Sequence, residues 1–284
     1  MFKLGFLANA EMLFWDYEKL CAYIKESGYD CVELIDDIVF APDKTQDDRM
    51  LLTKALEKNG LTVSEILLQH DLVVLDESER NANVDLIITN LKKAADMGVD
   101  TVNLFTGPIP WMPNPVIVNG QVSQGTAWNW VLSAFDKILK TAEEYKVRVA
   151  VENVWGMLVH DFYTNQYLQN RFDSKYLGVN LDPSHDVLSG NTDMNFLVNG
   201  WGKDKIFHVH LKDAVGVAEL NKFVFPVIGE GNVNFEEFFK ALKAIDYQGC
   251  ASVEFESWAY RKTMWNGEHA PAAPAMRKIL DKYL

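Results

Sequence analysis

Positive charge is scarce in this sequence. Its 284 residues include 27 lysines and arginines against 40 aspartates and glutamates, which gives a net charge of −13. A surplus of that sign repels nucleic-acid backbones and anionic membrane surfaces unless basic side chains gather locally. The densest basic groupings are scattered lysines such as Lys92-Lys93 and Lys203-Asp204-Lys205, which are typical of solvated helix faces. The composition therefore predicts no nucleic-acid partner and no membrane partner.

Cysteines and long apolar runs are also few. The three cysteines, Cys21, Cys31 and Cys250, show no Cys-x-x-Cys spacing, and we interpret them as buried reduced thiols. No apolar run approaches the roughly 18 residues that a membrane span requires. The N-terminus also lacks a charged-then-apolar segment followed by a small-residue cleavage site. These features predict a cytoplasmic protein.

Apolar runs of strand length alternate with longer amphipathic segments along the whole chain. This alternation is expected of βα units, and no linker or change in composition divides it. The sequence therefore predicts an α/β fold, a single (β/α)₈ TIM barrel that spans residues 1–284. Its strands are expected at 3–7, 31–35, 62–68, 101–105, 147–153, 177–185, 207–213 and 250–256. Helices are expected near 16–28, 45–59, 79–97, 126–145, 234–245 and 271–283.

Four of the apolar runs carry an acid or an imidazole near their carboxyl ends, namely Glu152, Asp182, His210 and Glu254. In a parallel barrel these ends meet on one face, so we expect the four side chains to form one site. Three carboxylates buried together without a cation would be forced to stay partly protonated. The set therefore predicts one bound divalent metal ion. Mn²⁺ is the expected ion, with Mg²⁺, Co²⁺ and Zn²⁺ as alternatives.

The motifs around these residues resemble those of the xylose isomerase-like TIM barrels. The resemblance is carried by Glu152-Asn153, Asp182-Pro183-Ser184-His185, His208-Val209-His210-Leu211-Lys212-Asp213, Gly229-Glu230-Gly231 and Ser252-Val253-Glu254. Within that superfamily the chain resembles the sugar phosphate isomerase/epimerase group, which includes tagatose/psicose epimerases, hydroxypyruvate isomerases and inosose dehydratases. The resemblance implies metal ligation by the four strand-end residues and a small sugar or polyol-derived substrate.

The resemblance also implies an activity. In the epimerases of that group two ligating glutamates move the substrate proton, which places this role on Glu152 and Glu254. A carbonyl and its neighbouring hydroxyl chelated to a cation have an acidified C–H, and the cation stabilises the resulting enediolate. One glutamate then removes the proton from one face while the other supplies one to the opposite face. The expected protein is a metal-dependent isomerase or epimerase of a ketose or related keto-sugar.

Several further side chains are expected around the substrate. The predicted substrate-binding residues are His185, His70, Lys212, Trp111 and Glu256. Further candidates for the cavity wall are Glu33, Trp155 and Trp258. The loop from Gly107 to Gly125 is long and apolar enough to be an ordered lid over the substrate. His208 lies two residues before His210 on the same strand face, and we interpret it as a packed core histidine.

Two positions differ from the ketose epimerases of the group. Those enzymes tend to carry a second glutamate six residues after the first and an arginine shortly after the histidine strand. This chain has Leu158 and Val217 at the corresponding places. The sequence therefore does not imply a tagatose- or psicose-type binding mode, and Lys212 alone does not indicate a phosphorylated substrate.

Three other functions stay open. A dehydratase of an inosose- or dehydroshikimate-like substrate would expel a β-hydroxyl from the same enediolate, with His70, His185 or Lys212 as the acid. An endonuclease IV-type DNA repair enzyme would need two further histidines, one at the end of the fourth strand and one in the seventh loop. This chain has none between His210 and His269. A non-catalytic sugar-binding protein is the third alternative. For each of these functions the chain could form a homo-oligomer.

Overall fold

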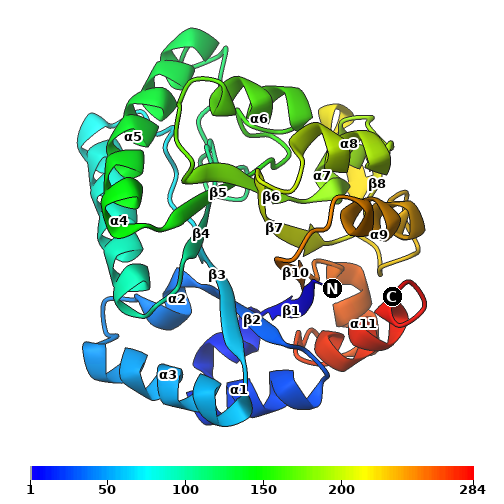
Figure 1. Cartoon of the computed structure of the whole chain (residues 1–284). Helices are drawn as coiled ribbons and strands as arrows, with labels where there is room; N and C mark the ends of the chain where they lie inside the picture. The colour runs from blue at the N-terminus through cyan, green and yellow to red at the C-terminus, as the bar shows by residue number, and fades with distance from the viewer. Residues whose placement is uncertain (1) are drawn as a thin grey trace.

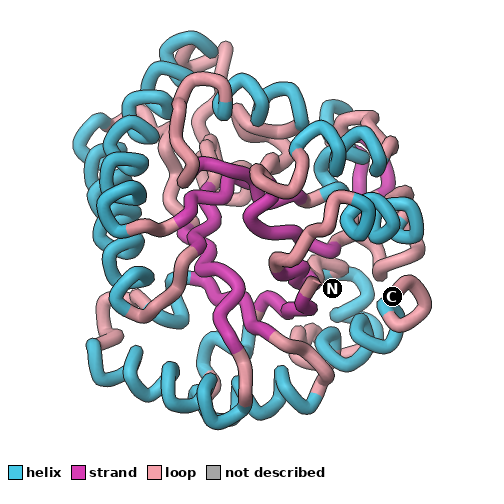
Figure 2. Tube along the Cα trace, in the orientation of Figure 1, coloured by secondary structure: helices cyan, strands magenta, loops and turns pink. Residues whose placement is uncertain are grey.

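Eight parallel strands close into a barrel in the computed structural model, which describes residues 2–284 (Figures 1 and 2). Around the barrel the order is β1-β10-β7-β6-β5-β4-β3-β2. The strands are β1 (Lys3–Leu7), β2 (Cys31–Ile35), β3 (Thr62–Leu68), β4 (Thr101–Leu104), β5 (Arg148–Glu152), β6 (Leu177–Leu181), β7 (Ile206–Leu211) and β10 (Cys250–Val253). The predicted TIM-barrel fold is confirmed.

The main helices form a ring around the strands, as Figure 1 shows along the barrel axis. They are α1 (Tyr17–Glu26), α3 (Gln46–Asn59), α4 (Glu77–Asp96), α5 (Gln124–Tyr145), α6 (Phe162–Gln169), α8 (Met194–Trp201), α9 (Phe235–Ala244) and α11 (Ala272–Leu280). Side-chain caps fix several of their starts, and α3 begins with a capping box between Thr45 and Asp48. Within residues 2–284, none of the helices combines the length and the apolar character of a bilayer span.

Short elements that the sequence pattern did not predict lie in the loops. They are η1 (Ala10–Phe14), α2 (Asp36–Val39), α7 (Pro183–Leu188), η2 (Ala218–Leu220), α10 (Trp258–Met264) and the antiparallel hairpin of β8 (Val215–Val217) with β9 (Lys222–Val224). The sixth strand ends earlier than predicted because Asp182 caps α7. Its side chain accepts a hydrogen bond from Ser184 N at 2.8 Å, and Pro183 opens the helix.

Asp213 fixes both ends of the loop that carries this hairpin. Its Oδ1 accepts hydrogen bonds from the backbone N–H groups of Ala214 (2.9 Å) and Val233 (3.0 Å). Its Oδ2 accepts from those of Gly229 (2.9 Å) and Gly231 (2.8 Å). Position 231 has no room for a side chain, since a Cβ there would lie 2.5 Å from the Asp213 Cγ. The hairpin therefore leaves and re-enters the barrel at one place.

The interpretation of all three cysteines as reduced thiols is wrong for two of them. Cys31 on β2 and Cys250 on β10 form a disulfide across the intervening strand β1, whereas Cys21 is free and buried. Gly5 on β1 makes this possible, because a Cβ there would lie 3.0 Å from one sulfur and 3.2 Å from the other. The two cysteines are 219 residues apart in sequence, so only the closure of the barrel brings them together.

Candidate metal and catalytic site

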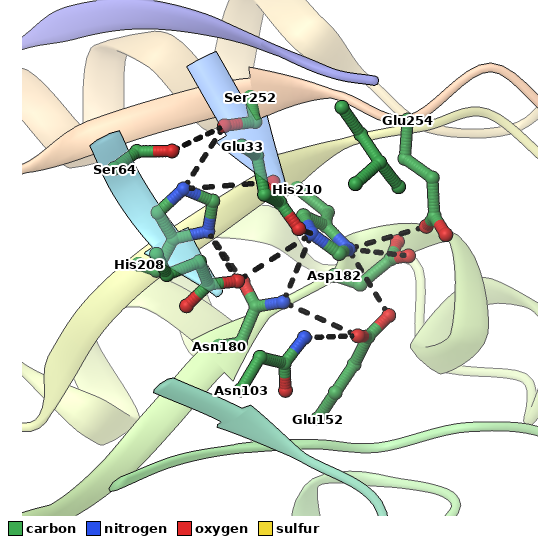
Figure 3. Close-up of polar contacts among 12 residues, drawn as sticks. Glu33, Ser64, Asn103, Glu152, Asn180, Asp182, His208, His210, Ser252 and Glu254 are labelled. Atoms are coloured by element: carbon green, nitrogen blue, oxygen red, sulfur yellow. Dashed lines mark hydrogen bonds and ion pairs between the residues drawn. The ribbon is translucent and has the colours of Figure 1, made fainter. Parts of the chain in front are cut away.

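The four strand-end residues lie together at the carboxyl end of the barrel (Figure 3). Glu152 is the last residue of β5, Asp182 follows β6, His210 lies on β7, and Glu254 follows β10. One ligand atom from each lies within 4.8 Å of all the others. We call these four residues the open cluster, because Glu152 and Glu254 also line a large cavity.

Hydrogen bonds hold the open cluster in a defined arrangement. His210 Nδ1 lies 3.1 Å from Glu152 Oε1 and 3.1 Å from Glu254 Oε2, so the two glutamates flank one imidazole nitrogen. Glu152 Oε2 accepts from Asn103 Nδ2 at 2.7 Å and from Asn180 Nδ2 at 3.2 Å. Sequence reasoning gave neither asparagine a role, since a lone amide inside a strand carries no signal of the side chain that it will contact.

Lys212, predicted to bind substrate, forms ion pairs with two members of the open cluster. Its Nζ is 2.9 Å from Asp182 Oδ2, 2.5 Å from Glu254 Oε2 and 3.2 Å from Glu256 Oε2. It also lies 3.1 Å from His185 Nε2, and it is buried. The ammonium group therefore neutralises part of the charge of the carboxylates around it.

The residues of the open cluster fit a divalent metal ion. Three carboxylates and one imidazole are a donor set suited to such ions. Within residues 2–284, Asp182 Oδ2 has no hydrogen-bond partner, and it lies 2.9 Å from Lys212 Nζ and 3.5 Å from His185 Nε2. His210 Nε2 lies 2.9 Å from Glu33 Oε1, which leaves Nδ1 to face the cluster. A carboxylate on the far nitrogen is the usual way in which a metal-binding histidine is oriented.

Burial and charge shift the pKa values of these groups in different directions. Burial raises the pKa of Glu152 to about 7, and the neighbouring Glu254 adds to the rise although His210 opposes it. Burial alone would raise the pKa of Glu254, but Lys212 and His210 hold it well below its ordinary value. Burial and the nearby ammonium lower the pKa of His185 to about 3, so its ring is neutral. The pKa of Lys212 is far above its ordinary value because the surrounding carboxylates outweigh its burial.

A second group of acids and imidazoles lies deeper in the barrel, and Figure 3 labels three of its members, Glu33, His208 and His210. Glu33, Glu65, His208 and His210 form what we call the sealed cluster, because its members are at most 1% exposed and do not line the cavity. His208 Nδ1 lies 3.1 Å from Glu65 Oε1, and His210 Nε2 lies 3.7 Å from the same oxygen. His210 thus belongs to both clusters, with one ring nitrogen toward each.

The sealed cluster corrects the expectation for Glu33 and adds polar partners to the expected burial of His208. Glu33 was a candidate for the cavity wall but lies beneath the cavity, against His210. His208 is buried as expected, but its partners are polar: Nδ1 donates to Asn180 Oδ1 at 3.1 Å, and Nε2 lies 3.0 Å from Ser252 Oγ. Sequence reasoning missed Glu65, which reads as an ordinary polar residue of a strand. Burial raises its pKa to about 8.

A cavity of about 950 Å³ opens above the open cluster. Of the predicted substrate-binding residues, His185, Lys212, Glu256 and Trp111 line it, as do the further candidates Trp155 and Trp258. His70 does not line it. Its Nε2 lies 2.7 Å from a carboxylate oxygen of Asp36, and its neighbour Gln69 faces the cavity instead.

The loop between residues 107 and 125 contributes less to the cavity wall than expected. Trp111 is its one cavity residue among those described, and its ring packs edge-on against Phe105 at 5.6 Å. Much of the wall comes from β9, from the residues that follow it and from α10. Closure of this loop over a substrate remains a prediction.

Comparisons with known proteins agree with this fold. The model of a family described as xylose isomerase-like TIM barrel matches residues 21–281. An uncharacterized protein of Methanocaldococcus jannaschii, MJ1311, is 30% identical over 186 residues, which are 63% of this chain and 59% of that protein. The inosose dehydratase of Bacillus thuringiensis is 28% identical over 158 residues, 51% of this chain and 52% of the enzyme. The chain thus spans between half and three fifths of these relatives.

Solved structures with this fold cover almost the whole chain. The 3-keto-D-glucoside 4-epimerase YcjR from E. coli has a TM-score of 0.76 at 17% identity and covers 100% of this chain and 99% of its own. A D-tagatose 3-epimerase-like protein has a TM-score of 0.74 at 23% identity, with coverages of 99% and 96%. The IOLI protein with a bound zinc atom has a TM-score of 0.73 at 21% identity and covers 99% of each chain. At these identities the likeness shows the fold alone.

Proposed function

The chain belongs to the xylose isomerase-like TIM barrel family, and from this premise we propose that it is a divalent-metal-dependent epimerase or isomerase of a keto-sugar. In this proposal Glu152, Asp182, His210 and Glu254 hold the metal ion. Glu152 and Glu254 also transfer the substrate proton. The proposal extends to this chain the activities for which two structural neighbours are named.

One observation carries the proposal. Glu152 and Glu254 flank the same nitrogen of His210 at 3.1 Å each, and both border the cavity above it. They come from β5 and from the end of β10, which lie apart around the barrel with β6 and β7 between them. A substrate carbon between them is therefore approached from two sides. Two-sided access is what inversion of a carbon centre requires of a base and an acid.

The bound ion would supply Lewis acidity that makes the C–H next to the substrate carbonyl more acidic. One of Glu152 and Glu254 accepts the proton from one face. The other supplies a proton to the opposite face. His185 and Lys212 lie at the cavity floor, where they can hydrogen-bond substrate oxygens.

Dehydration is the second candidate. It is favoured by Glu256, which borders the cavity 3.2 Å from the Lys212 ammonium and whose pKa burial raises to about 7. A group of this kind beside the cavity can protonate a departing β-hydroxyl, which then leaves as water. The inosose dehydratases among the relatives are consistent with this alternative.

Proton exchange in D₂O separates the candidates. The protein is incubated with Mn²⁺ and a panel of ketoses, 3-keto sugars and inososes, and the products are followed by NMR. Deuterium at carbon with retention of all hydroxyls supports epimerisation or isomerisation. Loss of water identifies a dehydratase. Binding without either change would contradict both enzymes and leave a sugar-binding protein.

A further inference from the structure

The cavity above the open cluster has two chemically different ends. The polar lining includes Asn9, Gln69, His185, Lys212 and Glu256, which can hydrogen-bond hydroxyls, and His185 and Lys212 are buried beside the open cluster. The aromatic and aliphatic lining includes Trp111, Trp155, Phe223, Val224, Phe225, Trp258, Tyr260 and Met264, which are all at least partly exposed to solvent. The polar end is matched to a sugar ring. The apolar end has no counterpart on a free sugar.

The aromatic side chains of one wall form a continuous series. The rings of Phe105 and Trp111 lie 5.6 Å apart, those of Trp111 and Trp155 6.5 Å, and those of Trp155 and Phe223 4.8 Å. The series ends at Phe225, 5.6 Å from Phe223 and edge-on to the His185 ring at 5.6 Å. It therefore runs from the mouth of the cavity to the side chains beside the open cluster.

Another part of the wall is formed by α10, which leaves large apolar side chains uncovered. Trp258 is 62% exposed and Met264 is 60% exposed, and both line the cavity. Large apolar side chains that surround a cavity rather than a flat surface are typical of ligand sites. This wall thus completes an apolar channel around the cavity mouth.

Charge and volume restrict what can occupy the channel. Lys212 is the one basic residue among the described residues that line the cavity, and it is engaged by carboxylates at the floor. A phosphate or a nucleotide would therefore find no free lysine or arginine among these residues and would meet the acidic Glu230. The volume of about 950 Å³ lies near the upper end of the roughly 300–1,000 Å³ found for sites of drug-sized ligands. One sugar ring leaves much of it unfilled.

We propose that the outer part of the cavity is a subsite for an uncharged aromatic aglycone, so that the substrate is an aryl glycoside with an oxidised sugar ring rather than a free monosaccharide. This proposal rests on the proposed function for the placement of the sugar end. The aglycone lies along the aromatic series from Trp111 to Phe225 and is covered by α10. Burial of one phenyl group in such a channel tightens binding by on the order of 10- to 100-fold.

Two ligands that share the sugar end test the proposal. The methyl and phenyl β-D-glucosides, both oxidised to the ketone at carbon 3, differ only in the aglycone. Calorimetric titration of the Mn²⁺-loaded protein is expected to show at least tenfold tighter binding of the phenyl compound. In Trp258→Ala and Phe223→Ala this preference shrinks. In Trp128→Ala it is unchanged, because Trp128 packs on Tyr167 outside the cavity lining.

The outcomes separate this proposal from the function on which it rests. A phenyl preference without carbon–deuterium exchange supports the subsite and contradicts the epimerase. Exchange on the methyl compound with equal binding of both ligands supports the epimerase and overturns the subsite. Failure of both ligands to bind also overturns it. A dimer that Trp258→Ala converts to a monomer, with no phenyl preference in the wild type, would show that a second copy covers this face.

Discussion

The open and sealed clusters contain the same kinds of side chain and share His210, yet their surroundings differ. Glu152 and Glu254 of the open cluster border the cavity, and Lys212 supplies a positive charge among its acids. The sealed cluster has no lysine or arginine among the described side chains that contact it at ion-pair distance, and it does not border the cavity. A similar set of donors thus occurs twice in one barrel. The two clusters are therefore distinguished by whether a substrate can reach them, and not by the kinds of side chain that they contain.

Removal of a carboxylate that belongs to the open cluster alone should have the largest effect. We expect Asp182→Asn to weaken the binding of the divalent ion by more than about 100-fold, since loss of a ligand costs more than loss of the groups that orient one. Elemental analysis after removal of loosely bound metal measures this. The matched control is Glu65→Gln in the sealed cluster, which should keep its metal. Equal metal content in both variants would contradict the prediction that the open cluster, and not the sealed cluster, binds the metal ion.

Loss of a proton-transfer group should reduce turnover more than binding. In Glu254→Gln the amide keeps the size and one oxygen donor, so some metal should remain. Turnover should fall by about 10²- to 10⁴-fold. Steady-state kinetics with metal quantified in the same sample gives the result, with the exposed cavity residue Glu230→Gln as control. Wild-type turnover and exchange in metal-loaded Glu254→Gln would show that Glu254 is a ligand only. Glu256 or His185 would then be the candidate base.

A change in the contact between the two clusters should have a smaller effect on metal binding than the loss of Asp182. Glu33 lies 2.9 Å from His210 Nε2 and orients the ring whose other nitrogen faces the open cluster. Glu33→Gln should weaken metal binding by about 10- to 100-fold. The turnover of the fully loaded variant should change much less. Competition with a metal-buffering chelator gives the affinity. An affinity equal to that of the wild type would show that the sealed cluster has no influence on the open one.

The smallest effect on catalysis is expected from Glu65→Gln, which should instead change how stability depends on pH. Burial raises the pKa of Glu65 to about 8 from an ordinary value of 4.5, so between these values the folded state binds more protons than the unfolded state. Stability therefore falls as the pH rises through this window, by at most about 1.4 kcal/mol per pH unit. Denaturant unfolding of chelator-treated protein from pH 5 to 8 should show this fall in the wild type and a shallower one in the variant. Parallel curves would contradict it.

The open cluster could be predicted from sequence because its signal is local. Each of its residues closes or nearly closes an apolar run, and barrel geometry gathers such ends on one face. Glu65 and Asn180 gave no such signal. Whether a polar residue inside a strand faces the barrel interior depends on register and closure, which involve strands far apart in the chain. The disulfide between Cys31 and Cys250 was mispredicted for the same reason.

The cavity wall was predicted less well than the meeting of the four strand-end residues. Trp111, Trp155 and Trp258 do line the cavity, but the hairpin and α10 that form much of its rim were expected as plain loop. Short elements of this kind lack a full period of apolar residues, so their pattern resembles that of a loop. His70 shows the opposite error. It lies near a strand end, as the residues of the open cluster do. Its side chain nevertheless contacts Asp36 on the short α2.

The four hydrogen bonds to Asp213 hold the two ends of the segment from 215 to 228 close together. Both of its ends are held by one carboxylate, and among the described residues its two strands pair with each other rather than with the barrel. Through Phe223, Val224 and Phe225 it contributes much of the apolar wall. A barrel of this kind can therefore acquire a different ligand preference by exchange of this one segment, while Glu152, Asp182, His210 and Glu254 stay in place.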